Sequence, residues 1–434
     1  MRCFVAFFKT AFCQAFLILK AVLFSMVVVR GAGAGRRNWV RFVPAFWFGS
    51  YGKKSLRNSH PNVRAELRPS LARRLNARLN AFRASGRRPK FFDELLIGVL
   101  GEEVPHLFSK VDIMDETYAE LPRPEFYKVD TVHDSIFTFP QYLEGLLERW
   151  HSFYLKGEQT VGGGKNIMRL DFDGRKVVLT IPNSELRKEI AHNLGLLLGK
   201  DNFLQNFPGQ SEREIAIPLE NRRGPVVFWK QPLAEIAKTL ANHVIPKGRY
   251  IMEKPLNIPL INGRTWEIRH LVHCDRLYRP VITAKYGKIG GDAYFGNMDL
   301  GGRPVLAEKP VHDVLQNSQK EREFLARSEG IALAGAKLLN AHLLSSLTSY
   351  INARMTGITP DNFFARRLAV DITGHLGRNG KLFPAVIEIQ YPIGFKSYVP
   401  ELEEVDKQAL ARVQAMDKAL EKQDLPLIQQ MLNG

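Results

Sequence analysis

Hydrophobic and polar positions alternate in short runs along the central part of the chain, and this pattern predicts antiparallel strands. Residues 167–172 and 176–181 alternate on either side of an Asp-Gly pair, as the two strands of a β-hairpin do. Further strands are predicted at 152–155, 226–229, 249–253, 265–273, 280–286, 368–372 and 385–389. The last two strands bracket a Gly-Arg-Asn-Gly sequence and therefore form a second predicted hairpin.

Helical periodicity separates these strands. It predicts amphipathic helices at 140–150, 185–198 and 233–243, a long helix at 320–351 and an amphipathic tail from residue 401. Helices mixed with antiparallel hairpins are typical of an α+β protein. The chain has 434 residues, more than one compact core usually absorbs, so we expect a multi-lobed region and an additional segment.

Residues 1–92 carry the excess positive charge of the chain. They contain 19 Lys and Arg residues and one acidic residue, Glu66, while the whole chain has a net charge of +17. Such a segment is either a solvated basic arm or a surface for an anionic partner, such as an acidic protein or lipid headgroups. A nucleic acid is the less favoured partner because no base-reading motif accompanies the charge. Within this segment, 70–88 is predicted to be a basic amphipathic helix, which fits an ordinary surface helix as well as a membrane or partner contact.

The start of the chain, 4–29, is strongly apolar but is interrupted by Lys9 and Lys20. Its longest uninterrupted apolar run, 21–29, is shorter than the roughly 20 residues that span a bilayer, yet it has the length of a signal-peptide core. A signal peptide, a membrane-surface helix and a start codon assigned too early are the three options. Only three cysteines occur, which argues against a disulfide framework and favours a reducing compartment. We expect a cytoplasmic protein, with membrane association through 4–29 as an option.

Candidate groups for ATP chemistry occur in order along the chain. Such chemistry needs a cation on the phosphates, a backbone loop that can wrap them, and carboxylates that hold Mg²⁺. Lys156 ends a predicted strand and is followed by three glycines at 162–164 and by Lys165. This is not a Walker loop, and a triple glycine alone is as typical of a flexible turn.

Two carboxylates, Asp371 and Glu388, lie near the centres of the strands of the second predicted hairpin. Pairing of these strands would bring both carboxylates to one face, where they suit a hard cation that prefers oxygen ligands. The alternative is that each carboxylate pairs with an arginine. The two histidines His270 and His273 lack the spacing of metal ligands, so we expect packed or surface side chains and no zinc site.

The flanking sequences extend this pattern into a family resemblance. AVDITGHLGRNGKLFPAVIEIQYPIGF resembles the metal-binding end of ATP-grasp enzymes, and YIMEKPLNIPLINGRTWEIRHLVH resembles their adenine-binding hinge and the strand that follows it. Together with LPRPEFY, HSFYLKGEQTVGGGKNIMRL and FGNMDLGG, these segments are most similar to YheC/YheD-type and tubulin–tyrosine-ligase-like ATP-grasp proteins. The resemblance covers 121–395 and implies two α/β lobes that clamp MgATP, preceded by a basic helical N-terminal extension.

The resemblance also implies roles for individual residues. The nucleotide would be bound by Lys156, Gly162, Gly163, Gly164 and Lys165 at its phosphates and by Glu253, Lys254 and Leu256 at adenine and ribose. The catalytic positions would be Arg269 and Lys288 at the transferring phosphoryl group, with Asn297 near the substrate. The Mg²⁺ ligands would be Asp371, Glu388 and Gln390.

The implied activity is ATP-dependent ligation of a carboxylate to an amine through an acyl phosphate, with an amino acid, peptide or protein as substrate. The expected organisation is an N-terminal extension (1–90), a preceding lobe (91–150), an ATP-grasp domain (151–400) and a helical tail (401–434). Three departures weaken the match: Gln390 replaces the usual Asn, Gly157 replaces a Pro, and 184–224 looks like an insertion. The alternative is therefore a catalytically weak or inactive ATP-grasp-like assembly protein, recruited to an anionic surface by its basic N-terminus. A third option is an adaptor that uses nucleotide only for regulation.

Overall fold

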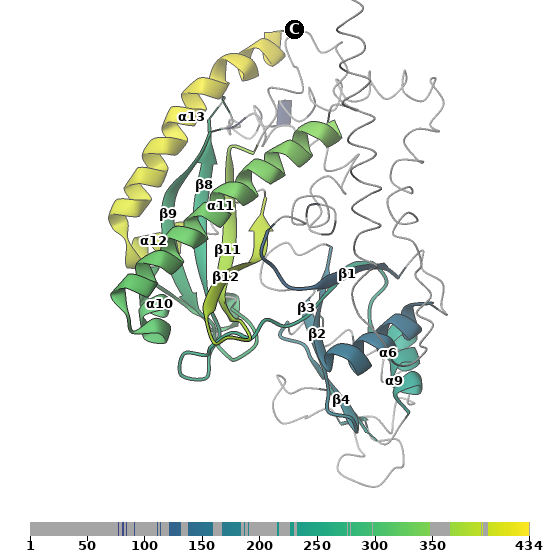
Figure 1. The fold of residues 1–434 in the computed structure, drawn as a ribbon. Helices are drawn as coiled ribbons and strands as arrows, with labels where there is room; N and C mark the ends of the chain where they lie inside the picture. Colours follow the sequence, from purple (N-terminus) through teal and green to yellow (C-terminus); the bar gives the residue numbers. More distant parts are fainter. Residues whose placement is uncertain are drawn as a thin grey trace, which may run out of the picture. The chain divides into compact units, whose positions relative to one another are not determined.

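The structure, a computed structural model, describes residues 121–131, 138–158, 167–183, 215–216, 226–229, 232–275, 279–296, 298–347, 365–391 and 398–433, with isolated residues between them. All of them lie in the compact unit Pro69–Gly434. The apolar segment 4–29, most of the predicted helix 70–88, the glycine loop 162–165 and most of 184–224 lie outside the described residues. The described residues form a mixed α+β structure with two antiparallel sheets (Figure 1).

The first sheet has seven strands in the order β1-β7-β2-β3-β4-β6-β5. These strands are β1 (Phe126–Asp130), β2 (Ser152–Gly157), β3 (Ile167–Phe172), β4 (Lys176–Thr180), β5 (Ile215–Ala216), β6 (Val226–Trp229) and β7 (Arg249–Glu253). All neighbouring strands are antiparallel. The β3–β4 hairpin turns at Gly174, whose φ of 88° lies in the left-handed region that glycine tolerates, so the predicted hairpin is confirmed.

One face of this sheet is apolar because alternate strand residues point into a helical layer. Phe153 and Leu155 of β2 and Met168 and Leu170 of β3 are fully buried in that core. The helices that contribute to the same core are α6 (Thr138–Trp150), α9 (Leu233–Thr239) and the π-helical turn η3 (Leu240–Val244). The intervening residues of β2 and β3 are partly buried and belong to the other face.

The second sheet has five strands in the order β10-β9-β8-β11-β12. These strands are β8 (Trp266–Cys274), β9 (Pro280–Ile289), β10 (Arg303–Val305), β11 (Arg367–Leu376) and β12 (Leu382–Gln390). The helices near it are η4 (Met298–Leu300), α10 (Glu308–Leu315), α11 (Ser318–Leu347), α12 (Val399–Val405) and α13 (Lys407–Asn433). All of its neighbouring strands are antiparallel.

The five-stranded sheet is covered by α11 on one face and by α13 on the other (Figure 1). Two residues of β8 show this arrangement, because residues three apart on a strand point to opposite faces. His270 contacts Ser328 of α11 through Nε2 and Oγ, 3.1 Å apart, whereas His273 contacts Asp417 of α13 through Nε2 and Oδ1, also 3.1 Å apart. Helices α12 and α13 cover only one end of their face, and the other end carries the charged cluster described below.

Buried ion pairs hold α13 against the start of β11. The guanidinium of Arg367 lies 3.1 Å from Oδ2 of Asp417 and also donates to the hydroxyl of Tyr398. The neighbouring Arg366 forms a second buried ion pair with Asp424. Each of these carboxylates balances an arginine that would otherwise be buried without a counter-charge.

The segment before β1 forms backbone hydrogen bonds next to one sheet and with a strand of the other. The carbonyl of Glu125 accepts from the amide of Lys254, which directly follows β7. The carbonyl of Pro122 accepts from the amide of Val386 in β12. This segment therefore bonds to both sheets near the residues predicted to bind nucleotide.

The predicted elements differ from the observed ones mainly at their ends. Strands β2, β9 and β11 extend further than predicted, to Gly157, Ile289 and Leu376, and the predicted helical tail is divided into α12 and α13. The strands β1 and β10 and the helix α10 were not predicted.

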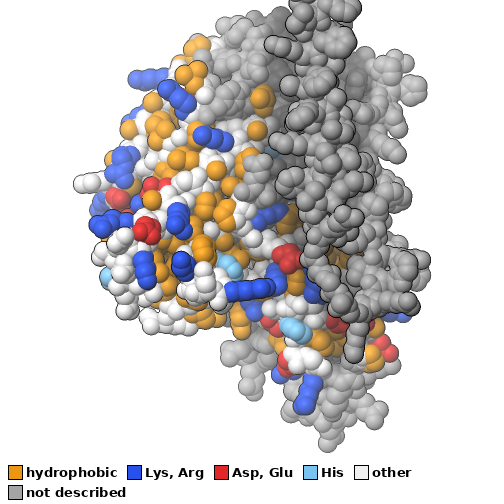
Figure 2. Space-filling model, viewed as in Figure 1, with side chains coloured by type: hydrophobic (Ala, Val, Ile, Leu, Met, Phe, Trp, Pro, Cys, Tyr) orange, Lys and Arg blue, Asp and Glu red, His pale blue; other side chains and the backbone are white. Residues whose placement is uncertain are grey.

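Charge on one face of the described surface is dispersed. On the face shown in Figure 2, Lys and Arg side chains are scattered among hydrophobic ones rather than gathered in one patch. Within the described part of the chain, no helix combines the length and the apolarity needed to span a membrane.

Candidate active site

Strand register brings two of the predicted catalytic residues, Arg269 and Lys288, and the predicted metal-binding residues to one face of the five-stranded sheet. Asp371 at the middle of β11 lies opposite Arg269 of β8 on one side and opposite Glu388 of β12 on the other. Lys288 of β9 lies opposite Glu267 of β8. Side chains of directly opposed residues share a face, so these five residues form one charged cluster beyond the end of α12 and α13.

Asp371 is the centre of this charged cluster. Its carboxylate accepts two hydrogen bonds from Arg269, from Nε at 2.8 Å and from Nη2 at 2.7 Å. The ammonium of Lys288 donates to the same carboxylate at 3.1 Å. Such bidentate, charge-assisted contacts fix both side chains, so the two cations are held at defined positions in a buried site.

Glu267 is the residue of this cluster that sequence reasoning left without a role. Its Oε1 lies 2.5 Å from Nζ of Lys288, so Lys288 is held between two carboxylates. A Cβ added at Gly296 would lie 3.0 Å from Oε2 of Glu267, so the loop after β9 approaches this carboxylate closely. The sequence does contain a signal for a role of Glu267. It lies two residues before Arg269 on the same strand, so both side chains point to one face of the sheet.

Mutual charge fixes the protonation states of the cluster. Burial acts to raise the pKa of Asp371, but Arg269 and Lys288 outweigh it, so its pKa is lowered and the carboxylate stays ionised. Burial and repulsion by Arg269 act to lower the pKa of Lys288, but Asp371 and Glu267 outweigh them and raise it. Burial raises the pKa of Glu267 despite the attraction of Lys288. Both cations are therefore charged.

Lys156 lies on β2 of the seven-stranded sheet and forms a buried ion pair with Glu253 at the end of β7. Burial acts to lower the pKa of Lys156, but Glu253 and then Glu388 outweigh it and raise the pKa, so the ammonium is charged. Because Glu388 belongs to β12, this effect links the two sheets electrostatically. Oε1 of Glu253 is buried and accepts no hydrogen bond from the described residues.

The predicted Mg²⁺ ligands carry oxygen atoms, the ligands that a hard cation prefers. Asp371 and Glu388 supply carboxylate oxygens from adjacent strands, and Gln390 supplies an amide from the same strand and face as Glu388. Nε2 of Gln390 lies 3.5 Å from Oδ2 of Asp371. Within the described residues, no group of three or more His, Cys, Asp or Glu side chains is arranged to hold a metal, so a cation here would need the amide and the phosphates as further ligands.

Other predicted site residues lie nearby or cannot be placed. Lys254 and Leu256 follow β7 directly, with Lys254 exposed and Leu256 partly buried. Gly162, Gly163, Gly164, Lys165 and Asn297 lie outside the described residues. Lys285, one of the basic residues in the same stretch, points to the α11 face, where it pairs with Glu329 at 3.0 Å.

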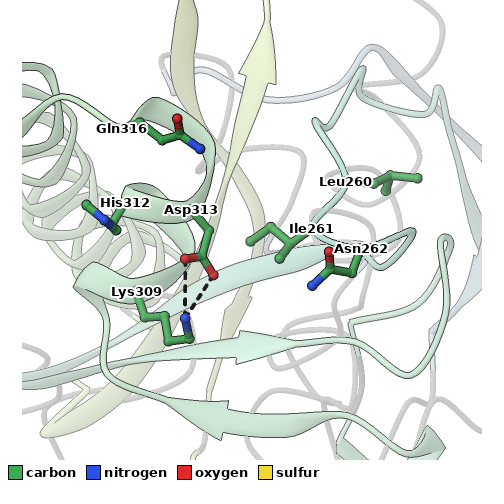
Figure 3. A pocket seen from close by; sticks show the side chains of 7 residues that line it. All are labelled: Leu260, Ile261, Asn262, Lys309, His312, Asp313 and Gln316. Carbon is green, nitrogen blue, oxygen red and sulfur yellow. Dashed lines mark hydrogen bonds and ion pairs between the residues drawn. The ribbon is translucent and has the colours of Figure 1, made fainter.

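A separate pocket of about 620 Å³ lies between α10 and the loop before β8 (Figure 3). Its lining comes from that loop (Leu260, Ile261 and Asn262), from one face of α10 (Lys309, His312 and Asp313) and from Gln316 directly after α10. Lys309 and Asp313 pair with each other at 3.2 Å across one turn of α10. None of the predicted site residues lines this pocket. We place the candidate active site at the charged cluster because strand register brings the predicted residues together there.

Comparisons with known proteins give distant structural similarity and no match in sequence. No family model matches the chain, and no curated protein matches its sequence. The chain is similar to the crystal structure of D-cycloserine synthetase DcsG, with 12% sequence identity and a TM-score of 0.36. The superposition covers 73% of this chain and 71% of that chain. At this TM-score the similarity carries no argument about the site, so function has to be inferred from the residues of this chain.

Proposed function

We propose that this chain is an ATP-grasp ligase that joins a carboxylate to an amine with MgATP. The observation that carries the proposal is the charged cluster of Glu267, Arg269, Lys288, Asp371 and Glu388, formed on one sheet face by strand register alone. Burying charges is costly unless they are paired, and a cluster of buried, convergent charges with shifted pKa values is a common feature of functional sites. The residues occur in the order and spacing of the family resemblance, which supports the same function.

The nucleotide-binding residues of the proposal come from both sheets. Lys156 would engage the phosphates in place of its present partner Glu253, and the peptide after Glu253 would border adenine. The unpartnered Oε1 of Glu253 offers a buried acceptor for a ligand N–H or O–H. Mg²⁺, when bound by Asp371, Glu388 and Gln390, would neutralise charge on the phosphates.

Arg269 and Lys288 have the catalytic role in this proposal. A substrate carboxylate oxygen attacks the γ-phosphorus, the bond to the β,γ-bridging oxygen breaks, and ADP leaves. The amine nitrogen then attacks the acyl carbon, phosphate leaves and the nitrogen loses a proton, which yields the amide. Arg269 and Lys288 are fixed by Asp371 and Glu267 before substrate arrives, so they stabilise the transferring group without reorganisation.

The proposal is tested with the full-length chain, MgATP and a panel of amino acids and peptides, with phosphate release as the measurement. Lys288→Met removes one cation at the transferring group and should lower turnover by about 10²–10³-fold. Lys285→Met is the matched control, because Lys285 lies on the same strand but points to the opposite face. If no member of the panel stimulates phosphate release, or if both variants lose turnover equally, the ligase proposal is wrong.

A second candidate function is a nucleotide-binding protein without ligase activity. The hydrogen bonding of Asp371 favours this candidate. Both carboxylate oxygens of Asp371 already accept hydrogen bonds, from Arg269 and Lys288. Gln390→Asn separates the two candidates because it restores the residue typical of the family. A rise in Mg²⁺-dependent turnover would favour a weakened ligase, whereas unchanged MgATP binding without turnover would favour the binding protein.

The basic segment 1–92 has a proposed role in either case, as a contact with an anionic acidic protein or lipid surface. Binding of the full-length chain to vesicles of anionic lipid should then weaken as salt rises. Binding that is independent of salt would contradict this role.

A further inference from the structure

The loop between β9 and η4, residues 290–296, packs closely at its base. The amide of Gly290 donates to the carbonyl of Thr265 at 2.8 Å, and the amide of Thr265 donates to the carbonyl of Asp292 at 2.9 Å. A Cβ at Gly290 would lie 2.4 Å from the carbonyl oxygen of Phe295. This close approach of backbone to backbone requires glycine and defines the path of the loop.

The same loop carries two adjacent aromatic residues, Tyr294, which is exposed, and Phe295, which is buried. Oδ1 of Asp292 accepts hydrogen bonds from the amides of Tyr294, at 2.7 Å, and Phe295, at 2.8 Å. The next residue is Gly296, whose backbone lies against the carboxylate of Glu267 in the charged cluster. A shift of this loop would therefore alter the space beside Glu267.

Residues of the seven-stranded sheet contact these aromatics. The hydroxyl of Tyr154 on β2 donates to the carbonyl of Tyr294 at 2.9 Å, and Nη1 of Arg169 on β3 donates to that hydroxyl at 2.9 Å. The guanidinium of Arg169 lies 4.2 Å from the ring centroid of Tyr294. The rings of Tyr154 and Phe295 meet edge to face at 5.9 Å.

Arg169 is held in place for this contact by a bidentate pair with Asp171, at 2.9 Å and 2.8 Å. Tyr154 also contacts the proposed nucleotide side, since Nζ of Lys156 lies 6.0 Å from its ring centroid. One side chain therefore contacts both Lys156 and the loop that lies against Glu267.

We propose that Tyr154 is a positioning residue that couples nucleotide binding at Lys156 to the placement of the loop 290–296 beside the transferring group. The nucleotide part of this inference rests on the proposed function, whereas the contact with the loop does not. Because coupling between two sites is reciprocal, a nucleotide that orders the loop must bind more tightly when the loop is already ordered.

The test is hydrogen exchange of the loop 290–296 in the full-length chain, with and without MgATP. Tyr154→Phe keeps the ring beside Lys156 but removes the hydroxyl that bonds Tyr294 and Arg169. In the ligand-free protein this change should speed exchange of the loop about tenfold, which corresponds to the loss of one hydrogen bond between neutral groups, here the hydroxyl of Tyr154 and the carbonyl of Tyr294. Tyr142→Phe, at an exposed tyrosine of α6, is the matched control and should change nothing.

The outcomes separate this inference from the proposed function. Unchanged exchange in ligand-free Tyr154→Phe, or faster exchange that extends equally to α11, would overturn the positioning role. If MgATP protects the loop in the wild type and protects it equally in Tyr154→Phe, the coupling is wrong. If MgATP does not bind the wild type, the proposed function fails, while the ligand-free comparison still decides whether Tyr154 holds the loop.

Discussion

Asp371→Asn is the most informative single substitution, and Asp417→Asn is its matched control. Both carboxylates are buried and both pair with an arginine of the five-stranded sheet, Arg269 in one case and Arg367 in the other. Asp417, however, lies on α13 at the opposite end of that sheet face. Replacing Asp by Asn keeps size and shape but removes the charge that balances a buried arginine.

The expected loss of stability follows from burial. The side chains of Arg269 and Asp371 are 8% and 3% exposed, and those of Arg367 and Asp417 are 5% and 6% exposed. Breaking a buried ion pair by removing one partner costs about 3–5 kcal/mol, and the neutral Asn, which retains one acceptor, should give the lower end of this range. Both variants should therefore lose about 3 kcal/mol in the free energy of unfolding.

The two variants should differ in nucleotide binding. Equilibrium unfolding in urea at neutral pH measures stability, and ATP titration with and without Mg²⁺ measures binding. Asp371→Asn should abolish the effect of Mg²⁺ on ATP affinity, whereas Asp417→Asn should retain it. If both variants lose stability and both retain the Mg²⁺ effect, Asp371 is a structural ion-pair partner and its assignment as a metal ligand is refuted.

Two further predictions concern residues next to the cluster. Burial and Lys285 lower the pKa of His270 to about 3, so the unfolded chain takes up a proton below pH ~6.5 that the folded chain takes up only near pH 3. Stability should consequently fall by about 1.4 kcal/mol per pH unit across this window, and a His270→Gln variant, compared by urea unfolding, should lack that contribution. Gly296→Ala should lower turnover about 10–100-fold by displacing Glu267 or the loop. Gly330→Ala in α11, where an added Cβ meets nothing within 4 Å, should instead leave turnover unchanged and raise stability by up to ~1 kcal/mol; equal turnover in the two variants would contradict the role of Gly296.

The hairpin that carries the three predicted metal ligands could be identified from sequence. Its alternation and its glycine turn predict the two strands and a pairing of Ile372 with Val386. A β-bulge between Asp371 and Ile372 then shifts the pairing by one residue, so that Asp371 lies opposite Glu388. The β3–β4 hairpin was equally predictable, because the Asp-Gly turn encodes it locally.

Contacts between distant segments could not be predicted in the same way. Lys156 and Glu253 lie far apart in the sequence, with β3 to β6 between them. They pair because β2 and β7 are neighbours in the seven-stranded sheet. Strand β1 was missed because its five residues contain only one buried position. Strand alternation places Glu267 on the same face as Arg269, but its close contact with Gly296 arises from the packing of the loop, which no local pattern encodes.

The direct test of the account is ATP binding by the full-length chain, measured calorimetrically with Mg²⁺ and with EDTA. The account predicts Mg²⁺-dependent binding that Lys156→Met weakens at least about tenfold, the usual effect of losing one buried charge-assisted contact. Lys176→Met, at a partly exposed lysine that pairs with Asp173 beside the β3–β4 turn, should leave affinity unchanged. Absence of binding, or equal weakening in both variants, would contradict the assignment of an ATP-grasp site.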